Sequence, residues 1–137
     1  MLTGLNHITL SVADIERSFG FYVDVLGCRP RARWNSGAYL SIGDLWLCLS
    51  LDQATHNAVP DEYTHIAFSV SETDFEVMRE HLQQHHARFW KDNISEGDSI
   101  YLLDPDHHKL ELHVGDLQSR LDSLKLHPYD GLQLFAE

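Results

Sequence analysis

Two seven-residue segments of this chain are near-copies of one another, and this repeat constrains the fold more than any other feature. Residues 6–12 read Asn-His-Ile-Thr-Leu-Ser-Val, and residues 64–70 read Thr-His-Ile-Ala-Phe-Ser-Val. In both, apolar residues alternate with polar or small ones, which is the period of a β-strand with two unlike faces. An acidic stretch that starts a helical pattern follows each copy. The repeat therefore predicts two related units, each opening with a strand that carries a histidine on its polar face.

The remaining patterns complete both units. The first predicts strands over 5–12, 28–33, 37–42 and 45–51, with a helix after Asp14 that Gly27 ends. The second predicts strands over 63–70, 88–91, 99–103 and 109–114, with a helix after Ser71 or Thr73. The order strand–helix–strand–strand–strand thus occurs twice. Leu117, Leu121 and Leu124 then mark a short helix before the tail.

These patterns predict an α+β fold in which paired βαβββ modules form a curved mixed sheet with helices on its apolar back. The 137 residues suit a single domain. Its modules are expected at about 1–57 and 60–115, followed by the C-terminal helix and tail at 116–137. The two-fold relation between the modules is expected to bring the two first strands together.

Bulk composition excludes several classes of function. The formal net charge is -11, which argues against a nucleic-acid binder or a protein of anionic membranes but leaves a small anionic substrate open. Cys28 and Cys48 are too few for a disulfide framework, so a reducing cytoplasm is expected. Neither a signal peptide nor an apolar run long enough to span a bilayer is present.

Three side chains on polar strand faces are candidate metal ligands. His7 and His65 occupy equivalent places in the repeat, and Glu111 lies on the polar phase of the last predicted strand. Two histidines and one carboxylate suit a divalent ion such as Mn or Fe, and tetrahedral Zn less well. Among ten histidines, a single one is more often a solvated or hydrogen-bonded strand residue. The repeat is what favours a metal site.

Short segments along nearly the whole chain form a characteristic series. They lie at 5–10 (Leu-Asn-His-Ile-Thr-Leu), 34–40 (Trp-Asn-Ser-Gly-Ala-Tyr-Leu), 45–50 (Leu-Trp-Leu-Cys-Leu-Ser), 63–68 (Tyr-Thr-His-Ile-Ala-Phe), 90–93 (Trp-Lys-Asp-Asn), 95–99 (Ser-Glu-Gly-Asp-Ser), 103–106 (Leu-Asp-Pro-Asp) and 109–115 (Lys-Leu-Glu-Leu-His-Val-Gly). In these segments the chain resembles the bacterial fosfomycin-resistance glutathione transferases, the FosA family of the vicinal oxygen chelate superfamily.

The resemblance implies an enzyme that opens the epoxide of fosfomycin with the thiolate of glutathione. It also implies a homodimer in which strands from both chains complete each site. It implies Mn(II) on His7, His65 and Glu111. The implied phosphonate contacts are Thr9, Lys91, Ser95, Tyr101 and Arg120, of which Thr9, Lys91, Tyr101 and Arg120 are the catalytic residues. The implied glutathione channel is formed by Trp34, Ser36, Tyr39 and Ser50. A potassium loop that activates the enzyme is implied at Asn93, Ser95, Glu96, Gly97 and Ser99.

Alternatives stay open at several positions. Lys91 and Arg120 also fit a solvated surface, the segment 93–99 also fits an ordinary polar turn, and Trp34 also fits core or dimer packing. Cys48 is expected to pack rather than ligate. Two residues depart from the family pattern: Ile94 replaces a basic residue, and His107 replaces a glycine, which matters if that turn has positive φ.

Three rival functions remain. The first is an epoxide hydrolase of the same superfamily, which the absence of a carboxylate between Trp34 and Leu40 disfavours. The second is a thiol transferase that uses bacillithiol or cysteine. The third is a non-catalytic protein that sequesters the antibiotic, which has no need of three metal ligands. Arg17 and Arg79, on the outer faces of the predicted helices, are expected to contribute little to kcat/KM for fosfomycin.

Overall fold

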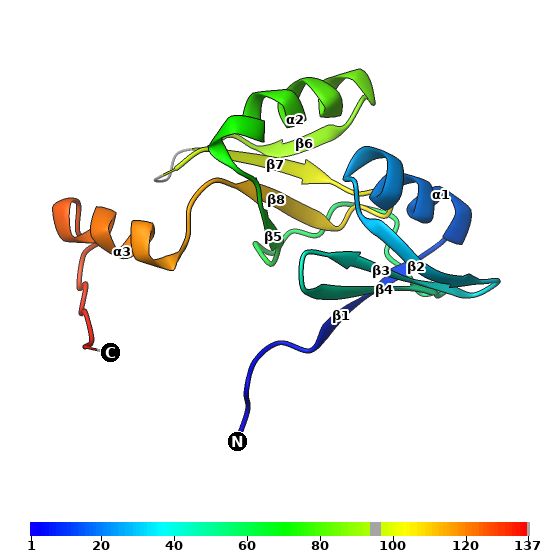
Figure 1. Cartoon of the computed structure of the whole chain (residues 1–137), viewed down its shortest axis with the longest axis horizontal. Helices are drawn as coiled ribbons and strands as arrows, with labels where there is room; N and C mark the ends of the chain where they lie inside the picture. Colours follow the sequence, from blue (N-terminus) through cyan, green and yellow to red (C-terminus); the bar gives the residue numbers. More distant parts are fainter. Residues whose placement is uncertain (94–96, 137) are drawn as a thin grey trace.

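The computed structural model describes residues 1–93 and 97–136. The first module contains β1 (His7–Val12), α1 (Ile15–Gly20), the π-helical turn η1 (Phe21–Val25), β2 (Arg29–Trp34), β3 (Gly37–Ile42) and β4 (Leu45–Leu51). The second contains β5 (Ile66–Ser69), α2 (Glu72–Gln84), β6 (Arg88–Lys91), β7 (Ser99–Leu103) and β8 (Lys109–His113), and α3 (Leu117–Leu126) follows (Figure 1).

Each module forms its own four-stranded mixed sheet, and the strand orders are the same. Sheet A has the order β1-β4-β3-β2 and sheet B the order β5-β8-β7-β6. In both, the first strand pairs in parallel with the last, while the other pairings are antiparallel. The predicted α+β fold of paired βαβββ modules is confirmed. The expectation that the two first strands come together is not met within the chain, because β1 and β5 lie in different sheets.

A β-bulge interrupts the second strand of each module at the equivalent place. In sheet A the register with β3 shifts between Pro30 and Ala32, and in sheet B the register with β7 shifts between Phe89 and Lys91. A bulge inserts one extra residue and turns the following side chain to the other face of the sheet. Lys91 consequently lies opposite Tyr101, on the face that also carries Glu111. Alternation alone would have placed Lys91 on the apolar back with Phe89.

The helix boundaries follow from local chemistry. Asp14 caps α1 by accepting a hydrogen bond from the backbone amide of Arg17, and Ser71 caps α2 by accepting from Asp74. Gly27, with φ of 77°, allows the chain to leave η1 in a left-handed conformation, as its place after the apolar pattern predicts. The π-helical turn was not expected, since no sequence pattern distinguishes it from a continued α-helix.

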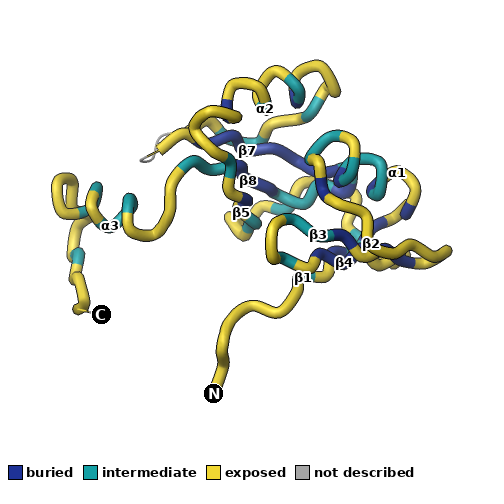
Figure 2. The backbone as a smooth tube through the Cα atoms, in the orientation of Figure 1, coloured by how far each residue is buried: buried dark blue, intermediate teal, exposed yellow. Residues whose placement is uncertain are grey.

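Helices α1 and α2 each cover one face of a sheet (Figure 1). Buried residues from both modules form one hydrophobic cluster. Figure 2 shows this buried zone running through β7 and β8 of sheet B and β3 and β4 of sheet A. The apolar phase of β4 behaves as expected, with Leu47 and Leu49 fully buried against the core. Cys48 on the opposite phase is also buried, but it is a free thiol.

Hydrogen bonds to two buried carboxylates, Asp104 and Asp106, attach the β7–β8 turn of the second module to the first. Asp106 accepts from the amide of Ala13, from Arg17 Nη2 at 2.8 Å and from Ser18 Oγ at 3.1 Å. Tyr22 Oη donates to Asp104 Oδ2. Arg17 is therefore not the uninvolved surface residue that the helical pattern predicts, because it pairs with a buried carboxylate. Arg79 is paired at the surface with Glu76, as expected of an outer face.

The turn also contains a backbone conformation that favours glycine. His107 has φ of 68°, in the left-handed region, so the departure from glycine at this position carries strain. Its ring lies beside Arg88, whose Nη1 is 3.0 Å from His107 Nδ1. This contact holds the strained residue in place.

The C-terminal helix stands apart from the rest of the chain. In Figure 1, α3 projects from the end of β8, with the tail turning away from both sheets. None of its residues is buried, while Leu117 and Leu126 are strongly exposed. Asp116 and Ser119 form a reciprocal capping box that starts the helix. The exposed leucines of this helix are apolar surface that a second protein surface could cover.

Candidate metal and anion site

His65 and Glu111 meet on the polar face of sheet B. Glu111 lies in the middle of β8, between Ala67 of β5 and Tyr101 of β7. His65 precedes Ala67 by two residues, so period-two alternation places it on the same face. The resulting distance between His65 Nε2 and Glu111 Oε1 is 3.1 Å, and the Glu111 side chain is almost fully buried. The strand pattern and the parallel pairing of β5 with β8 together create this contact.

The hydrogen bonds of His65 leave a place for a cation. Its Nδ1 lies 2.7 Å from the backbone carbonyl of Tyr63, and since a carbonyl only accepts, Nδ1 carries a proton. In the neutral ring, Nε2 then directs a lone pair toward a carboxylate oxygen. A proton or a metal ion must lie between two such acceptors. Two donors about 2.1 Å from one ion at a right angle are about 3 Å apart. The donor set therefore fits a divalent metal.

The other oxygen of Glu111 has partners of its own. Ser99 Oγ donates to Glu111 Oε2 at 2.7 Å, and His113 Nδ1 lies 2.7 Å from the same Ser99 oxygen. His113 Nδ1 is also 3.3 Å from Glu111 Oε2. Ser99 lies on the neighbouring strand β7, and His113 lies on β8 with Glu111. The carboxylate is thus oriented on one side by hydrogen bonds, while its other oxygen faces His65.

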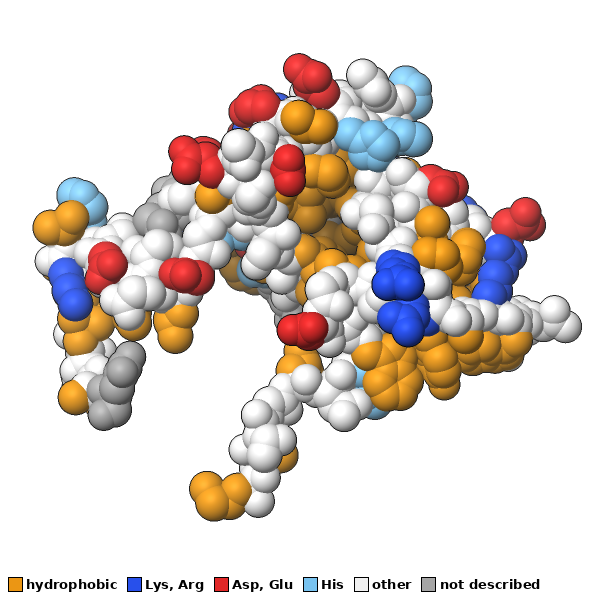
Figure 3. Space-filling model, in the orientation of Figure 1, with side chains coloured by type: hydrophobic (Ala, Val, Ile, Leu, Met, Phe, Trp, Pro, Cys, Tyr) orange, Lys and Arg blue, Asp and Glu red, His pale blue; other side chains and the backbone are white. Residues whose placement is uncertain are grey.

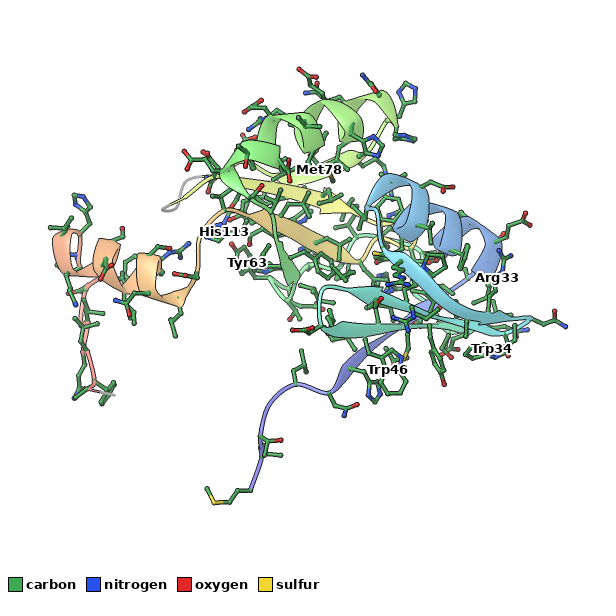
Figure 4. All side chains as sticks on the ribbon, viewed as in Figure 1. Arg33, Trp34, Trp46, Tyr63, Met78 and His113 are labelled. Atoms are coloured by element: carbon green, nitrogen blue, oxygen red, sulfur yellow. The ribbon has the colours of Figure 1, made fainter. Side chains whose placement is uncertain are left out.

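A lysine sits beside this pair among aromatic rings. Lys91 Nζ donates to Tyr63 Oη and lies over the rings of Tyr63 and Tyr101, 4.6 and 4.8 Å from their centroids. The hydrogen bond to the Tyr63 hydroxyl raises the pKa of Lys91, so the ammonium stays charged at neutral pH. The Trp90 ring completes this group of aromatic rings, and its indole N–H donates to the carbonyl of Leu110. Figure 4 shows Tyr63 and His113 beside β5 and β8 of sheet B.

The corresponding face of sheet A carries a row of rings that ends at His7. Ring centroids are 4.8 Å apart for Trp34 and Tyr39, 5.2 Å for Tyr39 and Trp46, and 4.5 Å for Trp46 and His7. Trp34 and Trp46 lie under this sheet, on the face turned away from α1 (Figure 4). Figure 3 shows hydrophobic side chains gathered along the lower edge of the molecule, under sheet A.

The predicted residues around this row are all accessible. Thr9, Ser36 and Ser50 are exposed, and His7 is exposed with its Nδ1 2.6 Å from Asn6 Oδ1. Thr9 pairs with Cys48 in the β1–β4 ladder, on the same phase as His7. An exposed aromatic row flanked by hydroxyls can receive a ligand or a second protein surface.

One chain does not bring all three predicted ligands together. His7 contacts Asn6 and Trp46 on sheet A, while His65 and Glu111 meet on sheet B. Among the residues that the structure describes, no three histidine, cysteine, aspartate or glutamate side chains form a set that could hold a metal ion. The separation follows from the topology, because β1 and β5 belong to different sheets.

The predicted potassium loop is described in part. Asn93 Nδ2 donates to the carbonyl of Gly97 at 2.6 Å, and Gly97 has φ of 77°. The Ser99 hydroxyl points to Glu111, so this side chain orients the carboxylate. Ile94, Ser95 and Glu96 lie outside the described residues. The predicted anion contact Arg120 is half-buried on α3.

Sequence reasoning missed three residues of this site. Tyr63 orients His65 through its carbonyl and Lys91 through its hydroxyl, while the Trp90 ring lies against the ring of Tyr63. His113 contacts both Ser99 and Glu111. Period-two counting from Glu111 already puts His113 beside it, and Tyr63 stands two residues before His65, so the same signal could have found both. The bulge at Trp90 has no such signal.

Neither cysteine is placed as a nucleophile. Burial raises the pKa of Cys28 to about 12, which keeps its thiol protonated. Cys48 is also buried, on the face of β4 that carries Trp46. Any thiolate chemistry at this site therefore depends on a thiol from another molecule.

Comparisons with known proteins agree with this architecture. Residues 4–112 match the family model described as Glyoxalase/Bleomycin resistance protein/Dioxygenase superfamily. The glutathione transferase FosA of Serratia marcescens is 52% identical over 134 residues, covering 96% of this chain and 95% of that protein. This chain belongs to the FosA family of that superfamily. No helix among the described residues of this FosA-family chain has the length and apolar character needed to cross a membrane.

Other relatives of this FosA-family chain are more distant. The metallothiol transferase FosB of Staphylococcus saprophyticus is 37% identical over 91% of this chain and 85% of its own length. A variant of the fosfomycin resistance protein FosX of Listeria monocytogenes, solved with Mn(II) and a dihydroxypropylphosphonic acid, superposes with a TM-score of 0.80 at 28% identity. That alignment covers 90% of this chain and 98% of the FosX chain.

Proposed function

We propose that this chain is a metal-dependent glutathione transferase that opens the epoxide of fosfomycin by thiol addition and so confers resistance to the antibiotic. The observation that carries the proposal is the His65–Glu111 pair, with Nε2 of a Nδ1-protonated imidazole 3.1 Å from a carboxylate oxygen. Full-length similarity to the glutathione transferase FosA supports the choice of reaction and of thiol.

Mn(II) is the metal proposed, held by His65, Glu111 and His7. The FosX structure with Mn(II) and a phosphonic acid supports the choice of ion. When bound, the ion would supply a Lewis acid that stabilises the negative charge on the opening epoxide oxygen. The protein's own part is to orient the two ligands of sheet B, through the Tyr63 carbonyl on one side and Ser99 on the other.

The phosphonate is proposed to bind beside the metal ligands. Lys91, fixed by Tyr63 and Tyr101, presents a charged ammonium on the face that carries Glu111. Thr9, Ser95, Tyr101 and Arg120 complete the proposed anion contacts. Because a phosphonate carries negative charge, a persistent cation compensates for the acidic surface of the chain at short range. The site thereby holds the epoxide carbon where a thiolate can reach it.

Glutathione is proposed to lie along the aromatic row of sheet A, bounded by Trp34, Ser36, Tyr39 and Ser50. Rings and hydroxyls on one exposed face suit a peptide with apolar and polar parts. A monovalent cation, K⁺, is proposed to bind the segment 93–99 and to activate the enzyme. We also propose a cytoplasmic location, on the evidence of two free cysteines.

A homodimer is the assembly that completes the proposed site. His7 lies on a different sheet from His65 and Glu111, so a second copy would contribute its own His7. The exposed leucines of α3 offer further apolar surface for that contact. In a symmetric dimer of this kind both sites are shared in the same way.

The reaction is tested by mass spectrometry of fosfomycin incubated with protein, Mn(II) and glutathione. A glutathione adduct that needs Mn(II) and is absent with His65→Ala supports the proposal. A diol formed in water alone would instead identify an epoxide hydrolase, and adducts with bacillithiol or cysteine but not glutathione would identify another thiol transferase. Fosfomycin that stays bound but unchanged would identify a sequestering protein.

Sharing of the site is tested by mixing two inactive variants, His7→Ala and His65→Ala. Random reassociation makes half of the dimers mixed, and each mixed dimer has one intact site of its two. The mixture should recover about a quarter of the wild-type activity per protein. No recovery after unfolding and refolding the variants together would place each site within one chain. Analytical ultracentrifugation measures the oligomeric state of each sample.

A further inference from the structure

We propose that His113 is a positioning residue that, through Ser99, fixes the Glu111 carboxylate for metal binding. The inference rests on the proposed metal site and adds a residue to it that is not itself a ligand. His113 lies two residues from Glu111 on β8 and directly opposite Ser99 on β7. The three side chains consequently share one face of the sheet and touch in sequence.

The directions of the hydrogen bonds follow from the chemistry of the groups. Ser99 Oγ donates its only proton to Glu111 Oε2 at 2.7 Å. The same oxygen can then only accept from His113 Nδ1, which is 2.7 Å away, so Nδ1 carries a proton. The chain of donors therefore runs from His113 through Ser99 to Glu111. Because Nδ1 is also 3.3 Å from Glu111 Oε2, the imidazole supports the same oxygen directly.

This support acts on one oxygen and leaves the other free to bind. Glu111 Oε2 is held by Ser99 and His113, while Oε1 faces His65. A carboxylate anchored in this way cannot rotate to offer both oxygens or swing out of the site. Hydrogen bonds that orient a ligating group commonly change metal affinity tenfold to a hundredfold when they are removed.

The surroundings of His113 hold its ring in this position. Its side chain is mostly buried, and Gly97 lies against it: a β-carbon built at Gly97 would approach His113 Cε1 to 2.9 Å and the Val114 carbonyl to 2.6 Å. A larger residue at 97 would push the ring or the strand. The imidazole is thus clamped between the backbone of Gly97 and the Ser99–Glu111 pair.

The test compares Mn(II) dissociation constants, measured from the electron paramagnetic resonance signal of free Mn(II). Ser99→Ala and His113→Leu should each weaken binding by about tenfold to a hundredfold. His113→Asn, whose amide nitrogen can replace Nδ1 as a donor, should recover most of the affinity. Ser69→Ala is the matched control, since it removes a hydroxyl from the strand pair beside His113 without touching Glu111. Equal affinities for His113→Leu and His113→Asn would overturn the inference.

A second measurement needs no metal. Long-range proton–nitrogen NMR of the metal-free protein should show a protonated Nδ1 on His113, and Ser99→Ala should shift that nitrogen resonance. An unprotonated Nδ1 would overturn the inference whatever the metal affinities are. In contrast, wild-type protein that binds Mn(II) no better than His65→Ala would overturn the proposed metal chemistry itself, so the two failures are distinguishable.

Discussion

Tyr22 and Asp104 connect the two modules through one buried hydrogen bond, in which Tyr22 Oη donates to Asp104 Oδ2 at 2.6 Å. Tyr22 lies in the π-helical turn of the first module, and Asp104 begins the β7–β8 turn of the second. Asp104 also accepts from the amides of Asp106 and His108. One carboxylate therefore shapes the turn and attaches it to the other module.

Replacing Tyr22 with phenylalanine should lower the free energy of unfolding by about 1–3 kcal/mol, because a buried carboxylate oxygen loses its donor. Urea denaturation followed by fluorescence measures the loss. Tyr129→Phe, in the exposed tail, is the control and should leave the midpoint unchanged. A Tyr22→Phe variant as stable as wild type would show that the bond contributes nothing to stability.

Asp104 should make stability depend on pH. Burial raises the pKa of Asp104, so the folded protein keeps this proton to a higher pH than the unfolded chain does. The contribution of this group to the free energy of unfolding therefore falls as the pH rises from about 3.9, the ordinary aspartate pKa, through the folded pKa. Asparagine cannot titrate and can still accept from both amides.

The measurement is urea unfolding of wild type and Asp104→Asn between about pH 4 and pH 7. The stability of wild type relative to the variant should decline as the pH rises from the ordinary aspartate pKa through the folded pKa, and it should be constant above that. A difference that does not change with pH would mean that Asp104 has the same proton affinity in the folded and unfolded states.

Lys91 and Arg120 should be needed for capture of the anionic substrate. A charge-assisted hydrogen bond contributes about 1.5–3 kcal/mol, so Lys91→Ala and Arg120→Ala should each lower kcat/KM for fosfomycin by about tenfold to a hundredfold at saturating glutathione. Lys125→Ala is the matched control, because it removes a surface charge from the same helix as Arg120. If Lys125→Ala loses as much as Arg120→Ala, the phosphonate does not bind where it is proposed to. Arg17 is unsuitable as a control, since it pairs with buried Asp106.

His107→Gly should stabilise the protein. A residue with a β-carbon in the left-handed region costs about 1–2 kcal/mol, part of which the contact with Arg88 offsets. The net gain in unfolding free energy should be about 1 kcal/mol or less. Thermal and urea denaturation of His107→Gly and of Arg88→Ala separate the two effects: His107→Gly should raise the midpoint and Arg88→Ala should lower it. A lower midpoint for His107→Gly would mean that the Arg88 contact outweighs the strain.

The sequence by itself determined the repeat, the strands and the faces that their residues occupy. Period-two alternation placed His65 and Glu111 on polar faces, and Asp14 marked the start of α1. The start of α2 was left between Ser71 and Thr73, and the structure shows that Ser71 is the cap. These features are local, since they depend on residues a few positions apart. The matching segments also identified the family, because sequence similarity along the chain is sufficient for that purpose.

Only the tertiary structure decided which of these faces meet. The pairing of β5 with β8 brings His65 within 3.1 Å of Glu111, and the bulge at Trp90 turns Lys91 toward them. The same topology places His7 on the other sheet, although His7 occupies the position in the sequence repeat that is equivalent to His65. Alternation specifies the face of a strand but not its neighbour, because strand pairing and register depend on contacts between residues far apart in the chain.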